Sequence, residues 1–287
     1  MLLKFLTELY LKNDDYKQST SSFIIDAHVH YQSDNKWERS FVDVYSRLQA
    51  MGCVMVRMDD LEKGIRFAKA NPERVIPYAM INIDSPTVLD DVRKVHDMGF
   101  KGLGELFAMN HWNYNDQKYE PLWTLAEQLN MPVTVHTGNL SNGMMARSRP
   151  AYLADIASRH RKLKILGVHF GNPWYEEAGE AARRNSNLFF DLSGSSLIKN
   201  EKDPDVWAKY LWWTPYTGKN SPHMPTDAVP AFEKLVFGTD ENPEALEENF
   251  IRFNKMLDAN NVSEKSRTKI YGLTMAGFHG IKVDAKK

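Results

Sequence analysis

Two histidines, His28 and His30, stand one residue apart at the end of the apolar run FIIDAHVH. Side chains two positions apart on a strand point to the same face, so both imidazoles can bind one ion. Imidazole and carboxylate groups suit Zn²⁺ and related divalent metals, and a catalytic site of this kind leaves one coordination position for water. The plain alternative is an amphipathic strand whose polar side happens to carry histidine.

Four further titratable side chains lie at the ends of later apolar runs: Glu105 in KGLGEL (101–106), His136 in PVTVHT (132–137), His169 in LKILGVH (163–169) and Asp240 in KLVFGTD (234–240). A lone histidine on a strand is usually a core or rim residue. Chance is a poor explanation when the first pair, His136 and Asp240 all fall at strand ends. We therefore expect a metal-activated water here, with Asp240 both binding the metal and accepting the proton of that water.

The roles of the remaining polar strand-end residues stay open at this stage. His169 is expected in the site, either as a metal ligand or as a general acid or base. Glu105 is either a ligand or the partner of a salt bridge with Arg57, which ends the second run. Arg57 in turn is either structural or binds a substrate carboxylate with two hydrogen bonds.

The apolar runs alternate with segments that repeat apolar residues every three or four positions. The runs predict strands at 23–28, 53–58, 75–81, 101–106, 132–137, 163–169, 188–193 and 234–240. The segments between them predict helices at 39–51, 61–72, 86–99, 119–130 and 149–160, and two more at 242–259 and 263–271. Eight strands separated by helices indicate an α/β fold, a (β/α)8 TIM barrel whose active site lies at the carboxyl ends of the strands. An open doubly wound sheet is less well supported, because no Gly-rich phosphate-binding motif follows the first strand.

Residues 194–233, rich in Pro, Gly and Trp, interrupt this rhythm between strands 7 and 8. An insertion of this length is usually a functional loop or lid. His223 within it, and His111 and Trp112 after strand 4, are candidate substrate contacts. Trp174, Trp212 and Trp213 either line the pocket with Trp112 or pack in the core.

The chain divides into an N-terminal extension, residues 1–22, and a single barrel domain, residues 23–287. Apolar residues of the extension fall on one helical face and predict an amphipathic helix that packs on the barrel or on a second subunit, so a homodimer is one expectation. Balanced charge, 36 Lys and Arg against 37 Asp and Glu, argues against a nucleic-acid partner, and no apolar run is long enough to span a membrane. A single cysteine, Cys53, fits the reducing cytoplasm and a place in the core.

The motifs resemble those of the metal-dependent amidohydrolase superfamily, in particular its amidohydrolase 2 branch, over about residues 23 to 282. IDAHVH resembles the HxH of strand 1. GFKGLGE and YEPLWTLAEQLNMPVTVHTG are similar to the passage from strand 4 to strand 5, LKILGVHFGNPW to strand 6, and KLVFGTDENP to the strand-8 motif. HxH alone is a weak signal, whereas the motifs in this order are specific.

The resemblance implies a barrel with a divalent metal, usually zinc, held by His28, His30, His136 and Asp240. It implies that His169 acts as acid or base, or binds a second metal. Two departures stand out: Thr274 occupies a position where Asn is common, and Glu105 replaces the strand-4 lysine of some two-metal members. The carboxylate is instead similar to that of TatD-type nucleases, where it helps to hold two metals, so one ion is expected and a second stays open.

These observations predict a hydrolase of a small-molecule ester, lactone or amide. The same family includes decarboxylases of aromatic acids that use the same metal site, so a decarboxylase is the alternative. A barrel that binds a ligand without catalysis is a third reading, and it predicts no bound metal.

Overall fold

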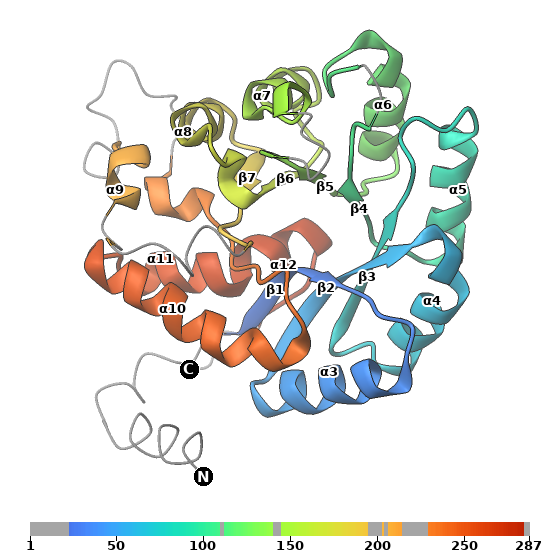
Figure 1. Ribbon diagram of the computed structural model, residues 1–287, viewed down its shortest axis with the longest axis horizontal. Coiled ribbons are helices and arrows are strands. Elements are labelled where there is room, and N and C mark those ends of the chain that lie inside the picture. Colours follow the sequence, from blue (N-terminus) through green and yellow to red (C-terminus); the bar gives the residue numbers. More distant parts are fainter. Residues whose placement is uncertain are drawn as a thin grey trace.

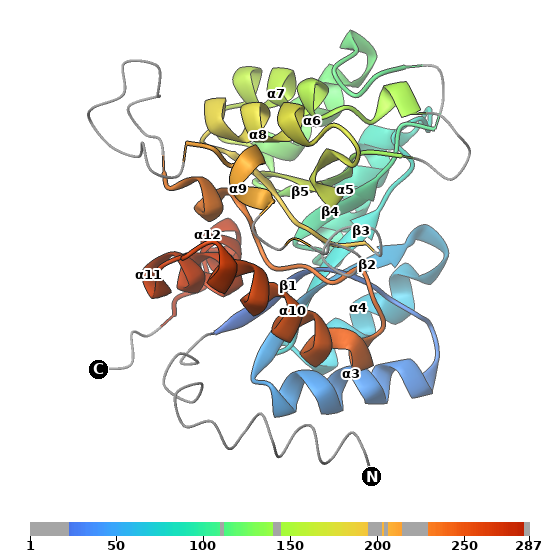
Figure 2. The ribbon, with the colours of Figure 1, turned by 60° about the vertical axis from the view of Figure 1, so that its left-hand side comes forward.

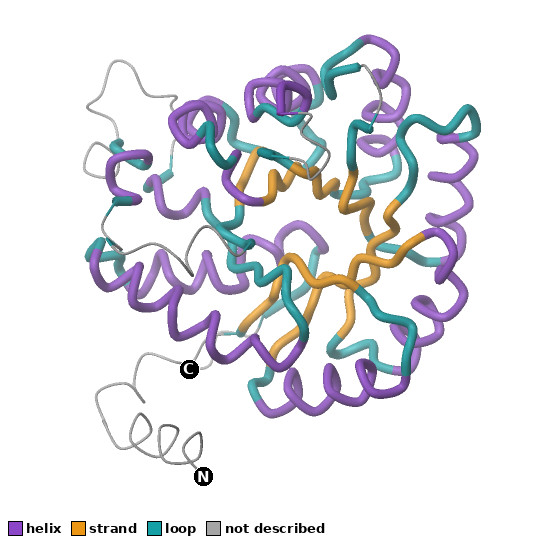
Figure 3. Tube along the Cα trace, viewed as in Figure 1, coloured by secondary structure: helices purple, strands orange, loops and turns teal. Residues whose placement is uncertain are grey.

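The computed structural model describes residues 23–109, 112–139, 145–194, 203, 206–213 and 229–283. Seven parallel strands pair in chain order: β1 (Ile24–His30), β2 (Ala50–Arg57), β3 (Val75–Met80), β4 (Gly102–Leu106), β5 (Val133–His136), β6 (Ile165–Val168) and β7 (Leu188–Phe190). The helices between them are α3 (Asn35–Arg47), α4 (Leu61–Ala70), α5 (Val88–Met98), α6 (Glu120–Gln128), α7 (Pro150–Arg159) and α8 (Tyr175–Arg184). After β7 come α9 (Trp207–Tyr210), α10 (Leu246–Ala259), α11 (Glu264–Thr268) and α12 (Thr274–His279). The strands curl into a central ring with the helices around it, which is the TIM barrel that the sequence predicts (Figures 1 and 3).

The eighth position of the ring is filled by an extended segment, residues 235–240, rather than by a regular strand. On one side the Val236 N–H donates to the Phe190 carbonyl of β7, at 2.9 Å. On the other side the segment bonds to β1, where Asp240 N–H donates to His28 O at 2.7 Å. The ladder is interrupted because the Phe237 N–H donates to Ile270 O instead of to a strand. The predicted strand 234–240 is therefore in the right place, but its pairing is incomplete.

Apolar side chains form two layers on either side of the strands. The inner cluster, which includes Ile25, Cys53, Tyr78 and Leu166, fills the barrel, and Met275 of α12 joins it. Lys164, directly before β6, donates to Gly277 O, so α12 covers the amino end of the barrel. Figure 2 shows α11 and α12 beside β1. With α12 at the amino end and the interior packed, the site is expected at the carboxyl ends of the strands.

Among the described α-helices, α3 and α11 begin at a residue whose side chain caps the helix, Asp34 and Ser263. Asp34 caps α3 by accepting from Lys36 N and Trp37 N, at 2.9 and 2.8 Å. The sequence analysis did not predict α8. Its buried face consists of small residues, Ala178, Gly179, Ala181 and Ala182, so the usual apolar periodicity is weak.

Part of the sequence interpretation falls on residues that the structure does not describe. The N-terminal extension 1–22, His111, His223 and most of the 194–233 insertion lie outside the described residues. In the described part of the chain, no helix is long and apolar enough to cross a membrane. The homodimer, the cytoplasmic location and the division at residue 22 stay predictions.

Candidate metal centre

Six titratable side chains meet at the carboxyl mouth of the barrel: His28 and His30 from β1, Glu105 from β4, His136 from β5, His169 directly after β6, and Asp240 at the end of the closing segment. We refer to these residues as the six-residue cluster. The carboxyl ends of parallel strands converge in a barrel, so residues far apart in the chain become neighbours. The structure thus brings together the full set of metal-ligand candidates that the sequence suggested.

The backbone of β1 and β4 aims the cluster inward. Ile25 and Ala27 face the barrel interior, and the pairing of β1 with β2 then shifts register between Asp26 and Val29. Such an irregularity changes which face the following side chains occupy, and it turns His28 and His30 toward the mouth.

Gly104, directly before Glu105, has a φ of 150°. A Cβ at Gly104 would lie 2.6 Å from the Cβ of Thr134 on β5. Glycine therefore permits the close approach of β4 to β5 that carries Glu105 into the centre.

The first half of the cluster consists of His28, His30 and Asp240, with one oxygen of Glu105. The two Nε2 atoms of His28 and His30 lie 3.1 Å apart. Asp240 Oδ1 lies 3.6 Å from the Nε2 of His28 and 3.3 Å from that of His30. Glu105 Oε2 is 3.5 and 3.3 Å from the same two nitrogens. Two imidazole nitrogens and two carboxylate oxygens thus converge on one small volume.

The second half consists of His136 and His169 with the other oxygen of Glu105. Glu105 Oε1 lies 2.7 Å from His136 Nδ1 and 3.6 Å from His169 Nε2. The second ring nitrogen of His136 lies 3.1 Å from Asn139 O. Because a carbonyl only accepts hydrogen bonds, that nitrogen donates to Asn139 O, and Nδ1 is the ring nitrogen that faces Glu105 and the centre. Glu105 stands between the halves, with one oxygen toward each.

The electrostatics of the cluster are those of a cation site. Burial alone would lower the pKa of His28, but the carboxylates of Asp240 and Glu105 raise it well above the usual value. Burial alone would raise the pKa of Glu105, but its hydrogen bonds with the histidines, led by His136, lower it well below the usual value. The pKa of Asp240 is also lowered, because the attraction of His28 and His30 outweighs burial. The carboxylates stay ionised, and the imidazoles beside them favour positive charge.

The donor set fits a divalent metal. Three overlapping groups of ligand atoms lie within 4.8 Å of one another: His28, His169 and Asp240; His28, His30 and Glu105; and Glu105, His136 and His169. Nitrogen and carboxylate donors of this kind suit Zn²⁺, Mn²⁺ and similar ions.

Two buried aspartates that the sequence analysis did not single out support the cluster. Asp26 accepts from His28 N at 3.1 Å and from Thr239 N at 3.0 Å, so it ties β1 to the closing segment. Asp191, directly after β7, lies 3.2 Å from His28 Nδ1. Asp191 had a detectable signal, since it is another carboxylate at the end of a predicted strand.

Arg57 does not form the salt bridge with Glu105 that was one reading of the sequence. Glu105 is surrounded by histidines instead, and no ion pair of Arg57 occurs among the described residues. Arg57 shares its strand face with Cys53 and Met55, which point into the barrel. As the last residue of β2 it is exposed and lies on the mouth side.

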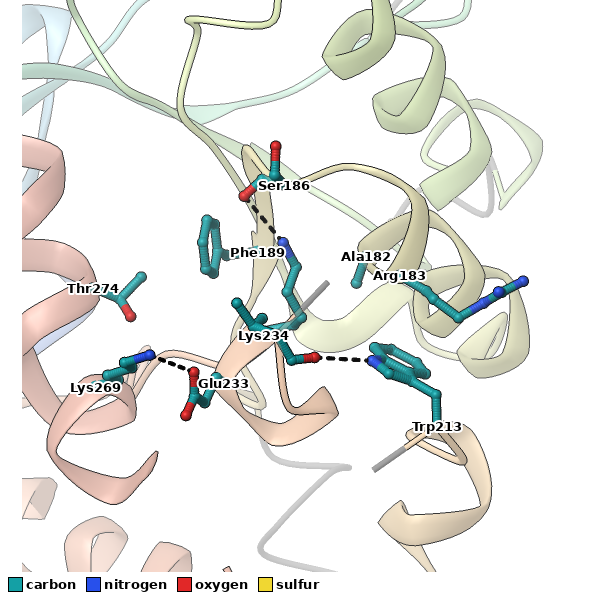
Figure 4. A pocket seen from close by; sticks show the side chains of 10 residues that line it. Ala182, Arg183, Ser186, Phe189, Trp213, Glu233, Lys234, Lys269 and Thr274 are labelled. Atoms are coloured by element: carbon teal, nitrogen blue, oxygen red, sulfur yellow. Dashed lines mark hydrogen bonds and ion pairs between the residues drawn. The ribbon is translucent and has the colours of Figure 1, made fainter. Parts of the chain in front are cut away.

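The candidate pocket tryptophans differ in their exposure to solvent. Trp112 is exposed, with the Lys118 ammonium 5.9 Å from its ring centroid, so a substrate contact for it stays a prediction. Trp213 is buried beside a cavity of about 150 Å³ that Lys234 also lines (Figure 4). Lys234 directly precedes the closing segment, so this cavity lies at the amino end of the barrel. Of the two alternatives for Trp213, the structure therefore favours packing in the core.

The family model described as "Amidohydrolase" matches residues 25–274. No curated protein matches the sequence significantly. The structure is similar to that of a probable 2-pyrone-4,6-dicarboxylic acid hydrolase from Acinetobacter baumannii, with 13% identity, a TM-score of 0.60, and coverage of 90% of this chain and 99% of the other.

Two other solved structures share the fold. A 5-carboxyvanillate decarboxylase from Novosphingobium aromaticivorans, with bound manganese, has 10% identity and a TM-score of 0.58, covering 91% of this chain and 97% of its own. A dihydroorotase from Campylobacter jejuni has 16% identity and a TM-score of 0.53, covering 91% and 84%. Identities this low show the barrel fold and leave the reaction to be argued from the site.

Proposed function

Because the chain belongs to the amidohydrolase family, we propose that it is a metal-dependent hydrolase of a small-molecule ester, lactone or amide. The observation that carries the proposal is the six-residue cluster, in which four imidazoles and two carboxylates meet at the open end of the barrel. Family membership supports an enzyme, and the cluster supports hydrolysis because a divalent metal can activate water at neutral pH.

We assign zinc as the metal and two ions as the loading. His28, His30 and Asp240 would hold one ion, and His136 and His169 would hold the other. Glu105 would contribute to both, since its two oxygens face different halves of the cluster. A single ion on His28, His30, His136 and Asp240 is the simpler arrangement, but it leaves the buried Glu105 without a function.

A bound divalent ion polarises the substrate carbonyl and lowers the pKa of a water molecule. Asp240 is the general base of the proposed reaction. Its Oδ1 faces the histidines, and its side chain is 28% exposed at the mouth, where water and substrate arrive. With two ions Asp240 also returns the proton to the leaving group, whereas with one ion His169 is free to donate it.

Arg57 supports a substrate that carries a carboxylate. It is exposed on the mouth side of β2, and guanidinium binds carboxylate with two parallel hydrogen bonds. Two of the similar structures are named for enzymes of carboxylic acids, a pyrone dicarboxylic acid and a carboxyvanillate. We expect Arg57→Gln to raise KM for an anionic substrate about tenfold or more, as the loss of one charge-assisted contact implies. Arg66→Gln, an exposed arginine on α4, is the matched control and leaves KM unchanged.

The test is a panel of lactones, amides and aromatic acids, assayed with zinc-loaded protein in ¹⁸O-labelled water. A hydrolase incorporates one labelled oxygen into the product, and Asp240→Asn abolishes the turnover. The second candidate is decarboxylation on the same site, which Arg57 also favours as a carboxylate anchor, since it has no ion-pair partner among the described residues. Carbon dioxide release without label in the product would establish that reaction and overturn the hydrolase.

A further inference from the structure

Two buried residues directly after β7, Asp191 and Ser193, contact the six-residue cluster at the Nδ1 atoms of its histidines. Asp191 Oδ1 accepts from His169 N at 2.8 Å, from Ser193 N at 3.1 Å and from the Ser193 hydroxyl at 2.7 Å. Asp191 Oδ2 lies 3.2 Å from His28 Nδ1. Both carboxylate oxygens of Asp191 therefore have hydrogen-bond partners, and these partners fix the orientation of the carboxylate.

The Ser193 hydroxyl has a single hydrogen, which it donates to Asp191. Its oxygen can then only accept from the two imidazole nitrogens beside it, His28 Nδ1 and His169 Nδ1, each at 3.1 Å. His169 Nδ1 also lies 3.2 Å from the carbonyl oxygen of Ser193, another obligate acceptor. Every partner of the two Nδ1 atoms is thus an acceptor, and both atoms must carry hydrogen.

In a neutral imidazole, hydrogen on Nδ1 leaves the lone pair on Nε2, which is then the nitrogen that would bind a metal. For His28 that nitrogen faces His30 and Glu105, and for His169 it faces Glu105. The two rings belong to different halves of the cluster, yet a single hydroxyl contacts both. Residues that bind the far nitrogen of a ligating histidine fix its tautomer and strengthen metal binding.

We propose that Asp191 and Ser193 form a positioning pair that holds His28 and His169 as Nε2 donors and so couples the two halves of the metal centre. This inference rests on the proposed metal function of the cluster. Neither residue is a ligand in it, because Asp191 Oδ2 faces the Nδ1 side of His28, away from the centre.

Asp191→Asn tests the pair with almost no change of shape. The amide oxygen takes the place of Oδ1, where three donors point, and the amide NH₂ then faces His28 Nδ1. Two donors cannot bond, so His28 shifts its hydrogen to Nε2 and withdraws its lone pair from the centre. We expect the affinity of the His28 half for Co²⁺ to fall roughly 10- to 100-fold.

Ser193→Ala is the second variant. It removes the shared acceptor but leaves Asp191 Oδ2 for His28 and the backbone carbonyl for His169. We therefore expect a smaller loss, below roughly tenfold, that affects both halves. Glu233→Gln is the matched control, since it neutralises a buried carboxylate at the opposite end of the barrel.

The experiment titrates chelator-stripped protein with Co²⁺ and follows the visible absorption bands of the ion, with thermal melts to verify folding. Asp191→Asn should weaken binding and alter the bands, while Glu233→Gln matches the wild type. Wild-type affinity and spectrum in both Asp191→Asn and Ser193→Ala would overturn the positioning pair.

A wild type that binds no Co²⁺ would instead overturn the proposed metal centre. The pair is then tested by ¹⁵N NMR of labelled histidines in the metal-free protein at pH 9. Hydrogen on Nδ1 of His28 and His169 supports the pair, and hydrogen on Nε2 with none on Nδ1 contradicts it.

Discussion

Asp26 provides the most direct test of how the barrel closes behind the cluster. Its buried carboxylate accepts four hydrogen bonds: from His28 N at 3.1 Å, Thr239 N at 3.0 Å, the Thr239 hydroxyl at 2.7 Å and the Tyr45 hydroxyl at 2.7 Å. These donors belong to β1, the closing segment and α3. One side chain therefore joins the three elements at the seam of the ring.

The cost of Asp26→Ala follows from these four donors. A buried donor left without a partner costs about 1 to 3 kcal/mol. Part of the sum is recovered, because the Thr239 hydroxyl can turn toward His28 O, 3.4 Å away. Burial also raises the pKa of Asp26, so removing the carboxylate ends an unfavourable desolvation. We expect a net loss of about 3 to 5 kcal/mol, because three of the four donors are left without a partner.

Asp26→Asn should cost less, about 1 to 2 kcal/mol, because the amide oxygen still accepts from the two backbone N–H groups. The amide nitrogen then faces the two hydroxyls, which can rotate to accept. Asp43→Ala, an exposed carboxylate on α3, is the control for the change in charge and should stay within about 0.5 kcal/mol of wild type.

The assay is urea unfolding of chelator-stripped protein at pH 7.5, so that metal binding does not contribute to stability. Two results would refute the reasoning: a free energy of unfolding for Asp26→Ala within about 1 kcal/mol of wild type, or equal losses for Asp26→Asn and Asp26→Ala. Either result would mean that the four hydrogen bonds to Asp26 do not stabilise the fold as described.

Three further predictions concern positions outside the six-residue cluster. Burial, with the charges of Lys164 and Lys101, lowers the pKa of His279 to about 4, below the ordinary value of 6.5, so the unfolded chain binds the proton more tightly. The free energy of unfolding should therefore fall by about 2 kcal/mol from pH 7.5 to pH 5 because of His279, and urea unfolding of His279→Gln should lack this loss. The same pH dependence in the wild type and in His279→Gln would contradict the prediction. Lys234→Met should cost about 1 to 3 kcal/mol in thermal melts, because the buried ammonium donates to Asn185 O and Ser186 O at 2.8 and 3.1 Å, and an unchanged melting temperature would contradict this. Gly138→Ala should lower the free energy of unfolding more than Gly99→Ala does. Both glycines have a φ near 100°, but a Cβ at Gly138 collides with the Asn172 backbone, whereas a Cβ at Gly99 meets only Ile65, at 3.9 Å. Equal losses of the two variants in urea unfolding would contradict the collision.

The barrel and most of the cluster could be predicted from sequence because their signals are local. The i, i+2 spacing of His28 and His30 and the strand-end positions of His136 and Asp240 follow from strand geometry and the convergence of parallel strands. The central place of Glu105 could not be predicted in the same way. Its four histidine partners come from the ends of three separate strands, β1, β5 and β6, and only the folded arrangement shows that histidines surround it rather than Arg57.

Other features depend on contacts that no local pattern encodes. The incomplete eighth strand arises because Phe237 N–H bonds to Ile270 O, in a segment much later in the chain. Helix α8 escaped prediction because its buried face is built from alanine and glycine. The link from Ser193 to both His28 and His169 requires β1, β6 and β7 in three-dimensional register.

Metal content tests the central claim most directly. Protein purified without chelator and dialysed against metal-free buffer is measured by elemental analysis, relative to chain concentration. The proposed function predicts two equivalents of a divalent ion, zinc foremost, since Glu105 directs one oxygen to each half of the cluster. One equivalent would contradict the shared role of Glu105, and a value near zero would contradict the metal centre itself.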